Sequence, residues 1–218
     1  MEKLVLDQSE MRVLGALIEK AVTTPEYYPL SLNALTNACN QINNRDPVMN
    51  LGETEVRRAV ESLRDKRLAY VSSGAVARVS KYGHQAAEVL ELPAPELAVM
   101  CVLMLRGPQT VGEIRGRTGR LHEFADLPAV QSVLQALASR PVPLVACLPR
   151  QTGTKESRYA QLLAGEAIAS AAGNGEQSEM AVPAESDRVA TLEKEVVALK
   201  AELADLRRQF ADFRKQLE

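Results

Sequence analysis

One pattern of residues occurs twice along this chain, and the repetition restricts the folds that the chain can adopt. The matching segments are Glu10–Lys20 with Glu96–Arg106, Val56–Lys66 with Val130–Arg140, and Ser80–Tyr82 with Ser157–Tyr159. An internal repeat defines the unit of folding before any propensity is considered, and here the unit has about 75 residues. Apolar spacing and turn residues predict three helices followed by a β-hairpin in each copy.

This order of elements is typical of a winged helix, which is a helix-turn-helix with an added β-hairpin. The predicted fold class is therefore mainly α with small β-hairpins, an α+β architecture that contains two tandem winged-helix domains. We place the first domain at residues 1–84 and the second at residues 85–163. With 218 residues, the chain is long enough for two small domains and an extension.

The first unit carries a local signal for each of its elements. Ser9 is a favourable N-cap for the first helix, Ser31 opens the second, and the third begins near Glu53. Segments 70–71 and 76–79 flank a glycine and have the composition of short strands. They are predicted to form the hairpin of the first unit.

The second unit repeats these elements with shorter connections. Its first helix starts at Pro95, where the missing N–H costs nothing, and Thr110 begins a capping box for the next helix. Asp126 is the predicted N-cap of the third helix. Segments 142–148 and 156–162 are predicted to form the second hairpin.

The two units differ most between their second and third helices. Here the first unit has a longer polar connection, Asn37–Asn50, which contains five asparagines. Asn favours caps and turns because its amide competes for backbone hydrogen bonds. The third helices align well, so Leu63 and Leu137 occupy equivalent positions, and we expect both side chains to be buried.

The last quarter of the chain divides into a linker and a coiled-coil helix. Residues 164–187 are rich in Ala, Gly, Ser and Glu, and such a composition predicts a flexible linker. In residues 188–218 an apolar side chain recurs every three or four positions, which is the a/d pattern of a coiled coil. The dimerisation seam consists of Val189, Leu192, Val196, Leu199, Leu203, Leu206, Phe210, Phe213 and Leu217.

Charges beside this seam indicate how two copies pair. With Val189 at position a, the g residues and the e residues that follow them are Arg188 with Glu193, Glu195 with Lys200, and Glu202 with Arg207. All these pairs are opposite in sign, and a parallel dimer brings each g next to the following e of its partner. We therefore expect a parallel homodimer formed through the C-terminal coil.

Composition excludes several classes of protein. Hydrophobic residues make up 46% and charged residues 25% of the chain, as in ordinary globular proteins. No apolar run approaches the roughly 20 residues of a membrane span, and the N-terminus lacks the apolar stretch of a signal peptide. Cys39, Cys101 and Cys147 are odd in number and lack metal-ligand spacing. We expect a cytoplasmic protein with reduced thiols and no membrane partner.

Catalysis finds little support in the sequence. His84 and His122 are the only histidines, and neither has a partner that the sequence reveals, so each is expected to be a packing or solvent-facing residue. The glycines match no phosphate-binding loop, and no nucleophile motif is present. We expect no enzymatic activity, no catalytic or metal-binding residues and no cofactor.

The most basic part of the chain lies between Arg106 and Tyr159. It holds eight Lys and Arg against four Asp and Glu, whereas the net charge of the whole chain is −2. Basic side chains can hold DNA phosphates while neighbouring polar side chains reach base edges. The candidate nucleic-acid-binding residues are Arg115, Arg117, Arg120, Gln131, Gln135, Lys155 and Arg158.

The first unit offers a secondary set of candidates. These are Arg57, Arg58 and Lys81. Glu53 and Glu55 lie at the start of the same helix, where they are unfavourable next to phosphate. A solvated helix face held by i,i+4 ion pairs explains this composition equally well.

Two unusual strings point to a known family. Residues 23–31 are TTPEYYPLS and residues 44–51 are NRDPVMNL. Together they resemble the bacterial YceH-like family of uncharacterised proteins. The similarity covers both repeated units and extends in outline to the C-terminal coil. It implies a tandem winged-helix fold and supplies no activity and no catalytic residues.

Two functions follow from these features. The first is a dimeric DNA-binding protein, a transcriptional regulator, because symmetric dimers of helix-turn-helix units read two half-sites on double-stranded DNA. The alternative is a protein–protein docking module without DNA binding, in which the loop at residues 37–50 is the partner surface. Salt-dependent retention on DNA separates the two functions.

Overall fold

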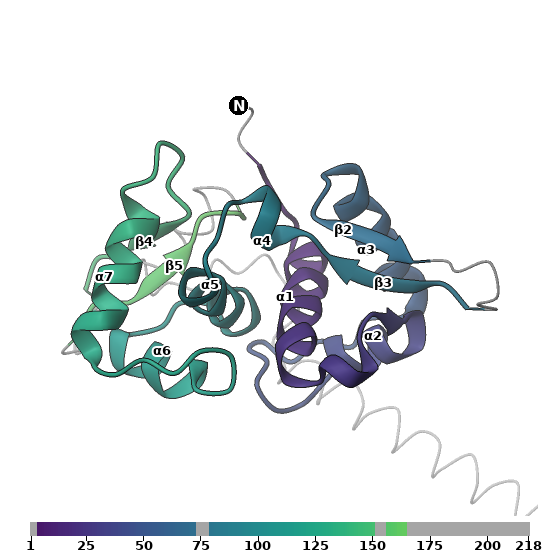
Figure 1. Cartoon of the computed structure of the whole chain (residues 1–218), viewed down its shortest axis with the longest axis horizontal. Helices are drawn as coiled ribbons and strands as arrows, with labels where there is room; N and C mark the ends of the chain where they lie inside the picture. The colour runs from purple at the N-terminus through teal and green to yellow at the C-terminus, as the bar shows by residue number, and fades with distance from the viewer. Residues whose placement is uncertain (1–3, 73–78, 151–155, 165–218) are drawn as a thin grey trace, which may run out of the picture. The chain divides into compact units, whose positions relative to one another are not determined.

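Helices form most of the described part of the chain, and small antiparallel sheets complete it (Figure 1). The computed structural model describes residues 4–72, 79–150 and 156–164. They all fall within one compact unit, Met1–Glu176. The combination of helices and small antiparallel sheets agrees with the predicted α+β class. The predicted linker after residue 164 and the predicted coiled coil lie outside the described residues.

Within the described residues, each half of this unit contains three helices of eight residues or more followed by a hairpin, and a short helix, Ala86–Val89, precedes those of the second half. The first half consists of α1 (Gln8–Thr23), the 3-10 turn η1 (Pro25–Tyr27), β1 (Leu30–Ser31), α2 (Leu32–Cys39), α3 (Glu53–Asp65), β2 (Ala69–Ser72) and β3 (Lys81–His84). The second half consists of α4 (Ala86–Val89), α5 (Ala94–Arg106), α6 (Val111–Thr118), α7 (Leu127–Ala138), β4 (Val145–Cys147) and β5 (Tyr159–Gln161). The element order predicted from the repeat is therefore present in both halves.

The N-cap of α1 differs from the prediction. Asp7, and not Ser9, caps the helix, because its carboxylate accepts the backbone N–H of Glu10 at 2.8 Å. The Glu10 carboxylate in turn accepts the Asp7 N–H at 2.7 Å. This reciprocal capping box satisfies two free donors of the first turn. Ser9 could not form such a box, because the residue three positions after it is Arg12 and not an acidic residue. The predicted caps Ser31, Thr110 and Asp126 are confirmed.

The second strand of the first hairpin lies later in the chain than predicted. It is β3, and in the sheet order β1-β3-β2 it pairs with both neighbours, with Tyr82 opposite Leu30 on one side and Val71 on the other. The predicted strand at 76–79 was wrong at its last residue, since Val79 is outside any strand and exposed. Residues 73–78 lie outside the described part. In the second half, β4 and β5 fall inside the predicted segments.

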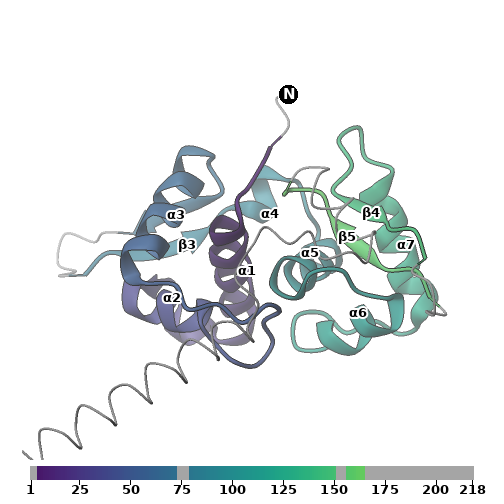
Figure 2. The same ribbon diagram turned by 180° about the vertical axis from the view of Figure 1, so that it is seen from behind.

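The two halves pack against each other through α1 and α5, which lie side by side in both ribbon views (Figures 1 and 2). Gly15 permits this approach, because a Cβ there would lie 2.8 Å from the Leu105 side chain. The Cys101 thiol donates to the Gly15 carbonyl at 3.4 Å. Gly15 and Cys101 hold the same position in the repeat, so equivalent positions meet, as they do across a twofold axis.

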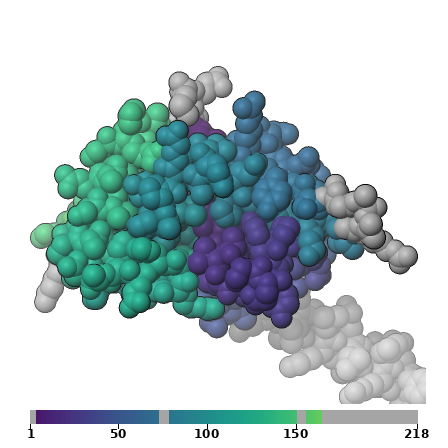
Figure 3. Space-filling model, in the orientation of Figure 1, coloured from purple at the N-terminus to yellow at the C-terminus, as the bar shows by residue number. Residues whose placement is uncertain are grey.

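Buried apolar side chains from both halves form one continuous core. Leu63 on α3 and Leu137 on α7 are both 0% exposed, which confirms their predicted burial. The space-filling view shows the second half, in green and teal, in direct contact with the purple α1–α2 region (Figure 3). The predicted domain boundary between residues 84 and 85 falls between β3 and α4. The division of the chain into two domains at this point stays a prediction.

The long polar connection between α2 and α3 also joins the halves. The Asn40 side chain links the two ends of this connection: its amide N–H donates to the Leu51 carbonyl and its amide oxygen accepts the Leu51 N–H, both at 2.8 Å. Across the interface, the Asp46 N–H donates to the Leu105 carbonyl at 2.9 Å, and Arg106 donates to the Asn44 side chain. The asparagines thus act as turn residues, as their type predicts.

Two buried arginines hold this connection in place. Arg45 donates to both carboxylate oxygens of Glu19, at 3.2 and 2.7 Å, and to the Ala38 carbonyl. Arg12 donates to the carbonyls of Cys39 and Pro47. Ala38 and Cys39 end α2, so both cations lie where the helix leaves unpaired carbonyls and the negative end of its dipole.

Candidate nucleic-acid interface

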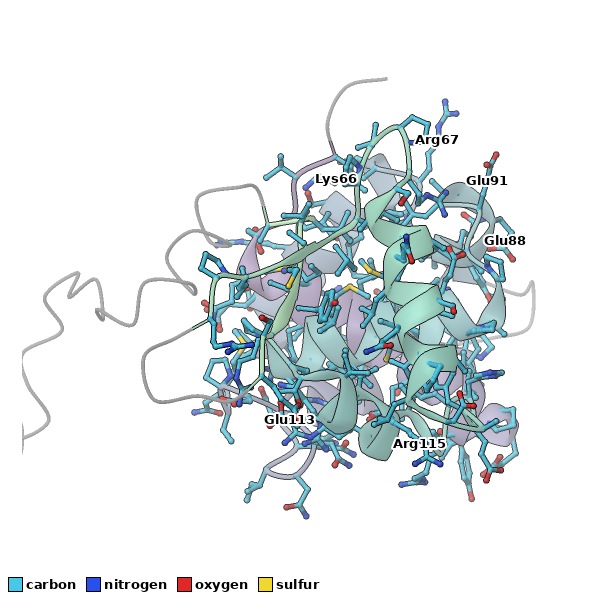
Figure 4. The ribbon with its side chains drawn as sticks, turned by 90° about the vertical axis from the view of Figure 1, so that its left-hand side faces the viewer. Lys66, Arg67, Glu88, Glu91, Glu113 and Arg115 are labelled. Carbon is cyan, nitrogen blue, oxygen red and sulfur yellow. The ribbon has the colours of Figure 1, made fainter. Side chains whose placement is uncertain are left out.

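Helix α6 carries two of the candidate arginines, Arg115 and Arg117, and a capping box fixes its start. Thr110 and Glu113 exchange hydrogen bonds, with the Glu113 N–H donating to the Thr110 hydroxyl at 3.2 Å and the Thr110 N–H donating to the Glu113 carboxylate at 2.9 Å. Figure 4 labels Glu113 and Arg115 near the bottom of the view and Lys66 and Arg67 near its top. Arg115 and Arg117 are exposed on the helix.

The structure brings Arg117 and Arg158 together through one carboxylate. Arg158, just before β5, approaches Glu113 at 3.0 Å, and Arg117 approaches it at 3.9 Å. Burial on its own raises the pKa of Glu113, but the Thr110 hydrogen bond and the two guanidinium charges outweigh it and lower the pKa. The carboxylate stays ionised, so it neutralises part of the positive charge that the sequence assigned to this surface.

Other arginines of the second half also have internal partners. Arg115 donates to the Phe124 carbonyl at 3.4 Å and to the Ala125 carbonyl at 2.8 Å, which holds the connection before α7. Arg140 binds the Glu96 carboxylate at 3.1 Å. Arg120 is exposed and has no hydrogen bond or ion pair within the described ranges.

The third helix of the second half exposes a polar face. Gln131 and Gln135 are exposed on α7, while the opposite side buries Val130, Leu134 and Leu137 in the core. Neutral amides of this kind can bond to base edges, and the contact of Gln131 and Gln135 with DNA stays a prediction. Lys155 lies outside the described residues.

The third helix of the first half carries exposed cations. Arg57 and Arg58 on α3 and Lys81 on β3 are exposed, and no ion pair involves them in the part of the chain that the structure describes. The predicted i,i+4 ion pairs on α3 are therefore not formed. Glu55 instead accepts the Gly52 N–H at 2.8 Å, and Glu53 accepts a long 3.5 Å hydrogen bond from the Asn33 amide.

Both histidines have packing roles. The His84 ring meets the Tyr28 ring edge-on, with centroids 6.2 Å apart, and the backbone N–H of His84 donates to the Tyr28 hydroxyl at 2.6 Å. Burial lowers the pKa of His84, with Glu88 acting weakly against it. His122 meets Phe124 edge-on at 4.7 Å. Over the described ranges, no three His, Cys, Asp or Glu side chains gather as a metal site.

The thiols inside the protein are held in their neutral form. Burial raises the pKa of Cys39 to about 12 and raises that of Cys101 further. Neutral buried thiols are poor nucleophiles and poor metal ligands. No helix of the described residues combines the length and the apolar character that a bilayer span requires.

Comparison with known proteins places the chain in a family. Residues 6–154 match the family described as "Protein of unknown function, DUF480". A UPF0502 protein of Geotalea daltonii is 57% identical over 192 residues, which cover 87% of this chain and 88% of that protein. The UPF0502 protein of Opitutus terrae is 54% identical, and the match covers 89% of this chain and 83% of that protein. The UPF0502 protein of Solibacter usitatus is 53% identical, and the match covers 88% of this chain and 91% of that protein. The chain therefore belongs to the DUF480 family, together with these UPF0502 proteins.

Proposed function

We propose that this protein is a dimeric DNA-binding protein that acts as a transcriptional regulator, with each half of the described unit a winged helix. The observation that carries the proposal is the repeated order of three helices and a hairpin, in which the third helix exposes a polar face. In winged helices and other helix-turn-helix modules this helix enters the major groove. The proposal assigns no catalytic activity and no cofactor to the chain.

The contacts with phosphate are proposed to come mainly from the second half. Arg115, Arg117, Arg120, Lys155 and Arg158 supply the positive charge, and Gln131 and Gln135 face base edges from α7. Arg120 has the strongest claim among the candidate arginines of the second half, because the residues that the structure describes give it no hydrogen-bond or ion-pair partner, whereas Arg115, Arg117 and Arg158 each have one. The exposed cations of α3 and β3, Arg57, Arg58 and Lys81, form the secondary surface.

Removing Arg115, Arg117 and Arg120 together should weaken binding to genomic DNA fragments at every sequence. For every phosphate that the variant no longer neutralises, the slope of log affinity against log salt should fall by roughly 1. The measurement is fluorescence anisotropy over a salt series, after circular dichroism has shown that the triple alanine variant is folded. This check matters because Arg115 also holds the carbonyls before α7.

The matched control is the double variant Arg57→Ala, Arg58→Ala, which removes exposed charge from the other half. An unchanged slope for the triple variant, with a reduced slope for this control, would move the phosphate-binding surface to α3. If the intact protein shows no binding even at low salt, the DNA-binding proposal fails.

A second candidate function, a protein docking module, is favoured by apolar side chains on the loop between α2 and α3. Ile42 is 80% exposed and Val48 is 56% exposed. Exposed apolar groups on an anchored loop suit a protein partner better than they suit phosphate. If docking is the function, the parent chain should not bind DNA, and serine at both positions should abolish capture of a specific partner.

The proposed parallel homodimer rests on the C-terminal seam. Removing residues 165–218 should leave a folded monomer, measured by analytical ultracentrifugation. The cut is compatible with the fold, because Leu163 is buried and its carbonyl accepts the Leu6 N–H at 2.7 Å, and both residues are retained. A truncated chain that stays dimeric would show that the folded halves associate by themselves.

A further inference from the structure

A cavity of about 300 Å³ lies where the two halves meet, and DNA binding gives it no role. Its walls come from α1, from the loop before α3, from α5 and from β5. An engineered cavity of about 150 Å³ already holds benzene, so this space suits a small organic molecule. A ligand here would touch both repeats at once.

Most of the wall is apolar and adaptable. Met11, Met49, Met104 and Leu103 line the cavity. Methionine is unbranched and polarisable, so a wall of methionines can fit side chains of different shapes. This part of the cavity suits an aliphatic or aromatic group of the ligand.

Arg12 brings a buried positive charge to the same wall. The residue is 3% exposed, and among the described residues its guanidinium donates to two backbone carbonyls while its buried Nε–H has no acceptor. The neighbouring carboxylate of Glu19 is occupied by Arg45 through two hydrogen bonds. A buried cation is costly unless an anion compensates it, and within the described ranges no carboxylate forms an ion pair with Arg12.

Asp46 adds an exposed carboxylate at the same cavity. Its backbone is fixed by the hydrogen bond to Leu105, whereas its side chain forms no hydrogen bond or ion pair in the described part of the chain. The cavity thus combines a buried guanidinium, a free carboxylate and an apolar wall. A negative and a positive group on one small ligand would complement both.

We propose that this cavity binds a free amino acid with an apolar side chain. The ligand carboxylate pairs with Arg12, the ammonium group pairs with Asp46, and the side chain lies among the methionines. Binding leaves all covalent bonds unchanged. The proposal is independent of DNA binding, and it gives the junction of the two repeats an effector site.

The test measures binding of L-leucine, L-methionine and L-phenylalanine to the full chain by isothermal titration calorimetry at millimolar concentration. At least one should bind with one molecule per chain. N-acetyl-L-leucine lacks the ammonium group and L-leucinamide lacks the carboxylate, so each should bind at least about tenfold more weakly, the usual effect of losing one charged hydrogen bond. If none of the three amino acids binds, the proposal is overturned.

The variant Asp46→Asn separates the assigned roles without disturbing the core. It should lose about tenfold or more in affinity for L-leucine, while its affinity for N-acetyl-L-leucine stays equal or rises, because the repulsion of Asp46 is gone. Asp65→Asn, an identical change at an exposed site on α3, should bind L-leucine as the parent chain does. The proposed orientation would be contradicted if Asp46→Asn lowered the affinity for L-leucine and for N-acetyl-L-leucine equally, or if it lowered neither.

Discussion

Replacing Arg45 by Met should lower the free energy of unfolding by about 3–5 kcal/mol, the usual cost of breaking a buried ion pair on one side. The Arg45 side chain is 0% exposed, and its partner Glu19 is 13% exposed. The variant removes the buried cation of the Glu19 carboxylate, leaving the partly exposed Lys20 beside it, and deprives the Ala38 carbonyl of two hydrogen bonds. Urea denaturation at neutral pH measures the loss.

The pH dependence of this loss gives the prediction a second readout. Burial raises the pKa of Glu19, but the hydrogen bonds and charge of Arg45, followed by those of Lys20, outweigh it, and the net pKa is lowered. A carboxyl group with a lowered pKa stabilises the fold above its unfolded pKa, and this contribution disappears as the pH falls through the folded pKa. The difference between the parent chain and the Arg45→Met variant should therefore shrink in acid.

Lys20→Met is the matched control, since Lys20 pairs with the same carboxylate at 3.2 Å and is 18% exposed. A partly exposed ion pair contributes roughly 0–1 kcal/mol. Removing both members in Glu19→Gln, Arg45→Met should recover part of the loss, because no unpaired charge remains. A cost for Arg45→Met as small as that of Lys20→Met would show that the interior charges are hydrated.

The repeat predicted the helices well because helix signals are local. The segments around Ser31, Thr110 and Asp126 contain their own caps, and the structure uses them. Asp7 was missed although its partner Glu10 stands three positions later, so the capping-box rule could have found it. The position of β3 could not be found locally, because its partner Leu30 in β1 is distant in the chain.

The candidate interface was harder to predict, because charges are neutralised by distant partners. Arg158 and Glu113 lie 45 residues apart in the chain, and Arg140 and Glu96 lie 44 apart, so a local count of basic residues treats both arginines as free. The sequence does contain an indication that Arg12 is unusual. In the repeat alignment its equivalent is Ala98, and a charged residue at a position that is apolar in the other copy indicates a special environment.

Leu63→Ala and Leu137→Ala should each lower the free energy of unfolding by about 2–5 kcal/mol, the range for a fully buried leucine. Both side chains are 0% exposed. The matched control is Leu127→Ala on α7, because Leu127 is 44% exposed and should cost about 0.5 kcal/mol or less. A comparably small loss at Leu63 or Leu137 would contradict the register of the repeat.

The same pair of variants also tests whether the two halves unfold together. Leu63 lies in the first half and Leu137 in the second, and both belong to the one core that passes through α1 and α5. If the packing of these two helices makes the halves cooperative, each variant shifts a single transition, and fluorescence of tyrosines and far-ultraviolet circular dichroism give the same midpoint. Two separate transitions, one of them moved only by Leu63→Ala and the other only by Leu137→Ala, would mean that the repeats are independent folding units.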